Sequence, residues 1–110
     1  MYTGSLPPAS IYGTWRENIE LVSAEDDTPY DTSVFTEVLV QLIDPLTKFA
    51  EMTLKLSEGQ VYFPQAGVME WRAEADSMWT LSTMLYEVLI LLYSDTDTVP
   101  LVIGSISIVD

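Results

Sequence analysis

The sequence contains no cysteine and no histidine, and only 4 lysine and arginine residues stand against 17 aspartate and glutamate residues. The missing cysteines exclude disulfides and thiolate zinc sites, and the missing imidazoles exclude Ser-His and Cys-His nucleophile pairs. Hard cations such as calcium or magnesium are the metals that this composition leaves open. A nucleic-acid partner is not expected, because four cations cannot neutralise a track of phosphates.

No targeting or membrane-spanning segment is apparent either. Residues 1–13 have neither the cationic region nor the apolar region of a secretion signal. The longest apolar run, Met84 to Tyr93, includes Glu87 and is much shorter than the roughly 20 residues of a membrane helix. We therefore expect a soluble protein with no membrane partner. The 110 residues and the net charge of -13 fit one acidic domain.

Alternation of apolar and polar residues dominates the chain after its first ten residues. Residues 1–10 contain Pro7 and Pro8 and are predicted to form an extended arm outside the core. Residues 11–110 are predicted to form one domain with short strands separated by turns, and residues 75–82 to form a crossing loop or helical turn. The predicted strands are 12–23, 34–43, 49–57, 60–63, 68–74, 83–93 and 99–109.

Seven short strands at this spacing predict an all-β fold, a seven-stranded immunoglobulin-like antiparallel β-sandwich. Tyr86 lies near the start of the penultimate strand, where such sandwiches have a tyrosine corner. We expect its hydroxyl to bond to the backbone a few residues upstream. This is a structural role.

The strand at 83–93 is apolar on both faces, whereas an antiparallel sandwich strand normally has one solvated face. If the strands at 83–93 and 99–109 are neighbours, as in the immunoglobulin order, their outward apolar residues merge into one patch, on an outer face that we expect them to share with the strand at 49–57. Such a patch favours a protein interface, in a homo-oligomer or in a larger assembly. The predicted partner-binding residues are Leu85, Leu89, Leu91, Leu101 and Ile103. Alternatively, the arm with Leu6 and Ile11, or the segment 75–82, folds over this patch.

Two acidic turns raise the possibility of calcium binding. The preference of aspartate for turns explains them more simply, and the two turns are expected at opposite ends of a sandwich. A pair of carboxylates for glycoside hydrolysis is also conceivable among 17 acids, although nothing marks a pocket or a raised pKa. We therefore predict no catalytic residues, no cofactor and no enzymatic activity. The acidic turns contain Glu25, Asp26, Asp27 and Asp31, and Asp95 and Asp97.

Three tryptophans suggest an alternative function. Trp15, Trp71 and Trp79 would form a carbohydrate-binding platform if their rings lay together on one open face. Isolated aromatic residues of a sandwich more often lie in the core or cover it.

A series of short motifs follows in order after residue 10. They are Thr14-Trp15, Val40 to Asp44, Met52 to Leu56, Glu58 to Val61, Gly67 to Ala73, Glu74 to Leu81, Tyr86 to Ile90 and Gly104 to Ile108. In order and spacing, this series resembles small phage and prophage virion proteins encoded in tail or fibre modules. It also resembles the N-terminal immunoglobulin-like domain of phage baseplate upper proteins. Two departures are Val88, where the family usually has a second aromatic residue, and Asp26-Asp27-Thr28-Pro29, where a glycine is common.

The resemblance implies a non-enzymatic virion protein of a tail, baseplate or fibre, made in the host cytoplasm and located in the particle. Its partners would be other virion proteins or further copies of itself. The family has no characteristic catalytic residues to carry over. A carbohydrate-binding receptor module remains the alternative.

Overall fold

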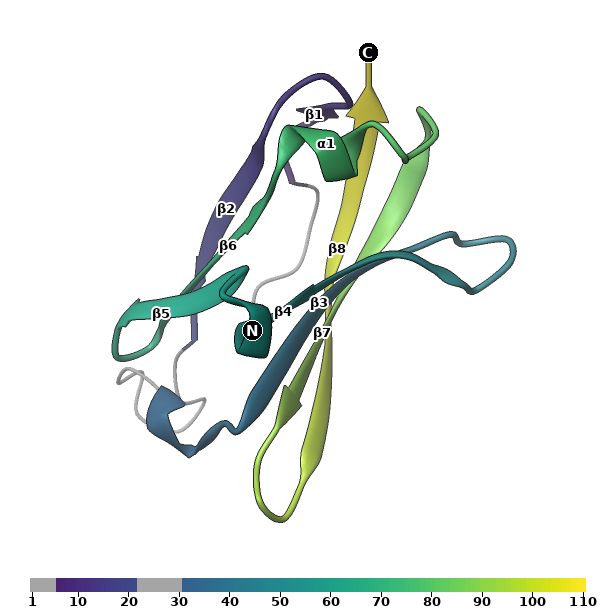
Figure 1. Cartoon of the computed structure of the whole chain (residues 1–110). Helices are drawn as coiled ribbons and strands as arrows, with labels where there is room; N and C mark the ends of the chain where they lie inside the picture. The colour runs from purple at the N-terminus through teal and green to yellow at the C-terminus, as the bar shows by residue number, and fades with distance from the viewer. Residues whose placement is uncertain (1–5, 22–30) are drawn as a thin grey trace.

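A computed structural model describes residues 6–21 and 31–110, which form two packed β-sheets (Figure 1). The larger sheet has five strands in the order β1-β8-β7-β3-β4, and the smaller has three in the order β2-β6-β5. The all-β sandwich predicted from the sequence is thereby confirmed. The strands are β1 (Ala9–Ser10), β2 (Trp15–Glu20), β3 (Glu37–Ile43), β4 (Ala50–Lys55), β5 (Val61–Gln65), β6 (Val68–Ala73), β7 (Leu85–Tyr93) and β8 (Thr98–Val109).

In residues 6–21 and 31–110, three short helices connect the strands. They are the 3-10 helices η1 (Thr32–Val34) and η2 (Leu56–Glu58) and the α-helix α1 (Ala75–Met78). The helical turn expected within 75–82 is therefore present, and its Met78 is fully buried. Within the described part of the chain, no helix is long and apolar enough to span a bilayer.

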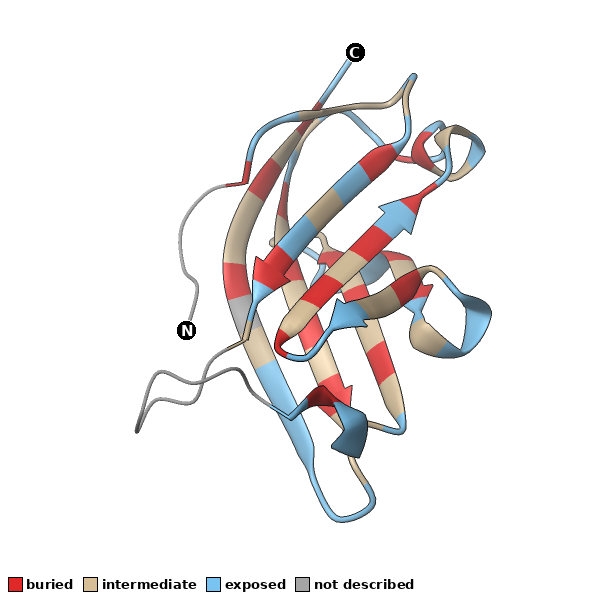
Figure 2. Ribbon diagram, turned by 90° about the vertical axis from the view of Figure 1, so that its left-hand side faces the viewer, coloured by how far each residue is buried: buried red, intermediate tan, exposed pale blue. Residues whose placement is uncertain are grey.

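The strands bury alternate residues because side chains of a β-strand point to opposite faces in turn. In β3, Val38, Val40 and Leu42 are buried, and the residues between them are only half-buried. Figure 2 shows this banding along the strands of both sheets. The inward faces meet in one core, whose largest fully buried side chains include Trp71, Tyr86, Leu42 and Leu54.

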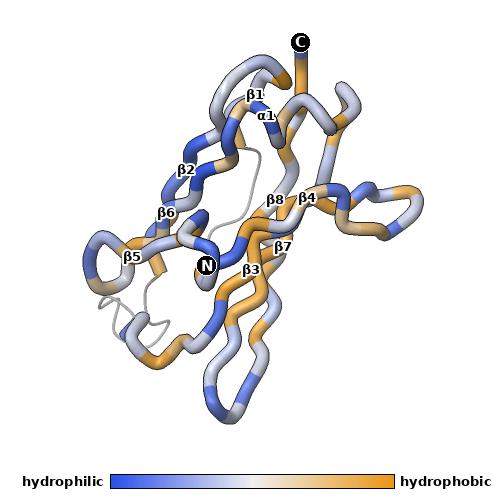
Figure 3. Tube along the Cα trace, in the orientation of Figure 1, coloured by the Kyte–Doolittle hydropathy of each residue, from blue (hydrophilic) through white to orange (hydrophobic). Residues whose placement is uncertain are grey.

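The five-stranded sheet is the more apolar of the two layers. Figure 3 shows hydrophobic residues concentrated along β3, β7 and β8, whereas β2 and β6 carry many hydrophilic residues. β7 lies in the middle of the large sheet, antiparallel to β3 on one side and to β8 on the other. β4 lies at the edge of this sheet beside β3. The expected contact of 49–57 with 83–93 was therefore wrong, because β3 separates the two strands.

The start of the described chain differs from the expected arm outside the core. Leu6 is buried in the core, and its amide donates to the carbonyl of Ser105 at 2.9 Å. Ala9 and Ser10 form β1, which pairs in parallel with the end of β8. Two prolines do not prevent this pairing, since β1 begins after Pro8 and lies at a sheet edge. Ala9 and Ser10 therefore add an eighth strand to the seven expected.

Candidate functional site

The outer face of the five-stranded sheet, which is turned away from the three-stranded sheet, presents leucines from β3 and β7. Leu39 lies opposite Leu91, and Gln41 lies opposite Leu89. Their chain neighbours, such as Val40 and Ile90, are buried toward the other sheet. Leu39, Leu89 and Leu91 are consequently on the outer face, where all three remain partly exposed. We call these three residues the leucine patch.

Polar and charged side chains surround the leucine patch. Glu87 precedes it on β7, and Glu37 precedes it on β3. The edge strand β4 adds Thr53 and Lys55, which lie opposite Gln41 and Leu39 and alternate with the buried Met52 and Leu54. Two carboxylates therefore accompany one cation on this face.

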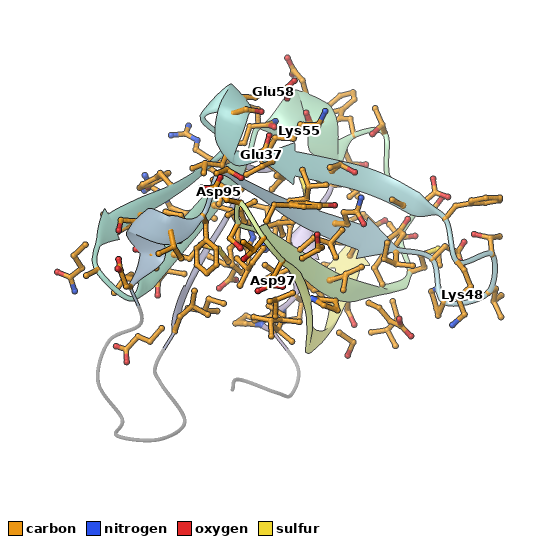
Figure 4. All side chains as sticks on the ribbon, turned by 90° about the horizontal axis from the view of Figure 1, so that it is seen from below. Glu37, Lys48, Lys55, Glu58, Asp95 and Asp97 are labelled. Atoms are coloured by element: carbon orange, nitrogen blue, oxygen red, sulfur yellow. The ribbon has the colours of Figure 1, made fainter. Side chains whose placement is uncertain are left out.

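Glu37 is held in place by the backbone of two elements. Its Oε1 accepts hydrogen bonds from the amides of Val38 at 3.0 Å and Ser57 at 3.1 Å. The hydrogen bonds from Ser57 hold the pKa of the Glu37 carboxyl below its usual value. Figure 4 shows Glu37 near Lys55 and Glu58, at the end of the sheet where η2 begins. The carboxylate thus remains charged beside the leucine patch at neutral pH.

Two of the five predicted partner-binding residues, Leu89 and Leu91, lie together in the leucine patch. Leu85 is on the same strand but apart from them, opposite Ser107 and beyond the end of β3. It is 51% exposed. Leu39 was not predicted, although it shares the parity of Glu37 and Gln41 on its strand. An apolar residue at an otherwise polar, outward position of the strand was the feature of the sequence that could have indicated Leu39.

The predicted outward placement of Ile103 and Leu101 was wrong. Ile103 is 1% exposed, and Leu101, opposite the buried Ile90, packs against the core. The cause is a β-bulge, because the pairing shifts from Val88 with Gly104 to Leu89 with residue 102 and leaves Ile103 as an extra residue. Ile106 and Ile108 are buried, and unbroken alternation from them would turn every odd-numbered residue of the strand outward. The bulge reverses this order before residue 104.

The segments considered as an internal cover of this face contribute to the core instead. Leu6, Met78 and Leu81 belong to the buried cluster, and Ile11 packs against it. Residues 1–5 and 22–30 lie outside the described residues.

The described acidic residues do not form a metal centre. Asp31 caps η1 by accepting from the Ser33 amide at 3.1 Å, which is ordinary turn chemistry. Glu25, Asp26 and Asp27 lie outside the described residues. Within residues 6–21 and 31–110, no three acidic side chains gather closely enough to hold an ion.

The three tryptophans do not share an open face. Trp15 and Trp71 are buried against one another, with ring centroids 5.8 Å apart. Trp79, after α1, is 67% exposed and contacts the exposed ring of Tyr12 edge to face at 5.8 Å. A platform of three rings is therefore excluded, and one exposed aromatic pair remains.

Tyr86 confirms the expected tyrosine corner. Its hydroxyl donates to the Ser82 carbonyl and accepts from the Ser82 amide, each at 3.2 Å.

Comparisons with known proteins show similarity at the level of the fold. No family model matches the chain, and no curated protein matches it. Among solved structures, it is similar to the endo-β-1,4-mannanase from Thermotoga petrophila, with a TM-score of 0.57 and 11% sequence identity. The similarity covers 94% of this chain and 18% of the mannanase chain. At this identity the likeness concerns the fold alone.

Proposed function

We propose that the protein is a non-enzymatic structural or assembly protein of a phage virion, in a tail, baseplate or fibre. It is made in the host cytoplasm and docks through the leucine patch onto other virion proteins or further copies of itself. The observation that carries this proposal is the position of Leu39, Leu89 and Leu91 on one partly exposed sheet face. The order of motifs shared with phage tail-module proteins supports the virion as the setting.

The physical basis of docking is burial of aliphatic area. Fully burying one such side chain contributes about 1.5–3 kcal/mol, and each leucine of the patch still has exposed area to lose. Leu91 also lies opposite the exposed Pro100 of β8, which extends the apolar surface. A sheet face of this kind is suited to a protein partner.

Charge restricts which partners fit. The outer face carries Glu37 and Glu87 against Lys55, and the whole chain has a net charge of -13. A partner with an apolar centre and flanking cations is therefore favoured, and acidic surfaces are repelled.

An immunoglobulin-like arrangement of the sandwich is part of the proposal. The tyrosine corner at Tyr86 and the central place of β7 between β3 and β8 support it.

The test uses purified particles of the phage that encodes the chain. We expect mass spectrometry to detect the chain in these particles, and Leu89→Glu to remove it from them. Leu85→Glu is the matched control, because it places the same charge on the same strand outside the leucine patch. Particles that lack the parent chain, or that retain the Leu89→Glu variant at the parent level, would contradict the proposal.

A second candidate is carbohydrate binding, which the exposed Tyr12–Trp79 pair favours. Sugar rings stack on exposed aromatic faces, and Trp79 is the exposed tryptophan among the three. Titration with a β-1,4-linked manno-oligosaccharide, the substrate class in the mannanase's name, should then change the fluorescence of Trp79. The change should be absent in Trp79→Ala. An unchanged parent spectrum up to millimolar sugar would count against this candidate.

A further inference from the structure

The turn that joins β3 to β4 displays the two most exposed large apolar side chains of the described chain. Leu46 is 88% exposed and Phe49 is 71% exposed. Figure 1 shows this hairpin projecting from the body of the sandwich. We call residues 44–49 the hairpin tip. Side chains of this size on a projecting turn can enter a partner surface without moving the sheet.

Hydrogen bonds hold the hairpin tip in one conformation. The Asp44 carboxylate accepts from the amides of Leu46 at 2.8 Å and Thr47 at 3.4 Å. The Asp44 carbonyl accepts from the Lys48 amide at 2.8 Å, and the Asp44 amide donates to the Phe49 carbonyl at 3.0 Å. Such a turn loses little conformational entropy when its side chains are buried by a partner.

Lys48 places a cation on the hairpin tip, where the Asp44 carboxylate of the same turn balances its charge. It is one of 4 cations, and its φ of 65° is the left-handed conformation that non-glycine residues rarely adopt. Figure 4 places Lys48 at one end of the molecule, apart from Glu37, Lys55 and Glu58.

The outer face of a second copy complements the hairpin tip. It offers the leucine patch to Leu46 and Phe49, and it offers the carboxylate of Glu87, which precedes the patch on β7, to Lys48. Two outer faces meeting each other around a two-fold axis would instead bring the Glu37 and Glu87 carboxylates of both copies together, with one Lys55 from each copy. Charge therefore favours tip against face over face against face.

We infer that the protein self-assembles head to tail, with the hairpin tip of one copy docked on the leucine patch of the next. This inference rests on the proposed function, because it assigns a partner to the same face. A contact between two different surfaces leaves an unoccupied hairpin tip at one end of each oligomer and an unoccupied outer face at the other end. Assembly consequently continues into a ring or a filament.

Mixing two deficient variants tests the inference. Phe49→Asp should prevent docking by the hairpin tip and leave the outer face intact. Leu89→Asp should prevent docking on the outer face and leave the hairpin tip intact. We expect the parent to form larger species as concentration rises in sedimentation velocity. Each variant alone should weaken association by about thirtyfold or more, as for a central interface residue. An equimolar mixture should form one-to-one dimers, because one intact tip meets one intact face.

A charge exchange provides a second pair in case Leu89→Asp fails to fold. Lys48→Glu and Glu87→Lys each change a partly or fully exposed side chain outside the core. Each should weaken self-association alone. A mixture of the two should restore assembly with the two variants alternating, because every contact between different variants then pairs one cation with one carboxylate.

Three results would overturn the inference. They are a parent that stays monomeric at all concentrations, a Phe49→Asp variant that assembles like the parent, and mixtures that do not associate. None of them removes the proposed function, since a monomer found in particles by mass spectrometry would still dock on another virion protein. Absence from the particles, with self-assembly intact, would remove the virion role alone.

Discussion

The hydroxyl of Tyr86 and the backbone of Ser82 form a reciprocal pair of hydrogen bonds. The hydroxyl donates to the Ser82 carbonyl and accepts from the Ser82 amide, both at 3.2 Å. Burial raises the pKa of Tyr86, so the hydroxyl keeps its proton and its donor role at neutral pH. The pair fastens the segment after α1 to the start of β7, the central strand of the larger sheet.

Tyr86→Phe should lower the free energy of unfolding by about 1 kcal/mol, because it removes both hydrogen bonds and leaves the ring in the core. Urea unfolding followed by circular dichroism measures the loss. Tyr93→Phe, a change of the same atom at the partly exposed end of β7, is the control and should have little effect. Equal stability of Tyr86→Phe and the parent would contradict the role assigned to this hydroxyl.

Glu37→Gln should reduce the loss of stability in acid. The pKa of Glu37 in the folded protein lies below its usual value of 4.5. Its charged form therefore adds stability above about pH 4.5, and this contribution disappears as pH falls through the folded-state pKa. Thermal unfolding between pH 6 and 3 should show a shallower decline for Glu37→Gln than for the parent.

Glu58→Gln is the matched control, since it removes one exposed carboxylate from η2. If the parent and Glu37→Gln lost thermal stability equally as pH falls, the hydrogen bond from the Ser57 amide would not favour the charged carboxylate.

Lys48→Gly should stabilise the hairpin tip, whereas Lys48→Ala should not. Both variants remove the charge, but only glycine adopts a φ of 65° without steric cost. The gain should be no more than about 1 kcal/mol, because glycine also raises the entropy of the unfolded chain. If Lys48→Ala were more stable than Lys48→Gly, the backbone at this position would not be strained.

Gly104→Ala should be destabilising by about 1–3 kcal/mol. Gly104 lies at the bulge of β8 with a φ of 133°, which a residue with a Cβ rarely adopts. Gly13→Ala is the control, because open space surrounds its added methyl group and its φ is not positive. If the two alanine variants were equally stable, the bulge would not depend on glycine.

Much of the fold could be predicted from the alternation of apolar and polar residues along the sequence. The features that could not be predicted depend on pairing between segments that are distant in the sequence. Alternation located β3 and β7 because buried residues such as Val40 and Ile90 recur at every second position. It failed in β8 because the bulge beside Gly104 changes parity within one strand, which places Ile103 in the core. An isolated glycine inside a strand pattern was the available warning.

Two further differences concern sheet neighbours. The two residues of β1 are too few to show periodicity, and their place depends on pairing with Ile108 and the residue after it. β4 lies beside β3 and not beside β7, because a tight hairpin pairs consecutive strands. Leu39 was not predicted as part of the candidate site for the same reason, since β3 was not expected next to β7.

Protection of the outer face inside the assembled particle is the most direct test of its role as a docking surface. The chain has no cysteine, so a single thiol reports on one position. Gln41→Cys places it opposite Leu89 at the leucine patch, and Asn18→Cys places it on the exposed side of β2 as a control. We predict that both thiols react rapidly in the dilute chain, and that only Gln41→Cys becomes protected in purified particles. Equal reactivity of the two thiols in particles would contradict the account.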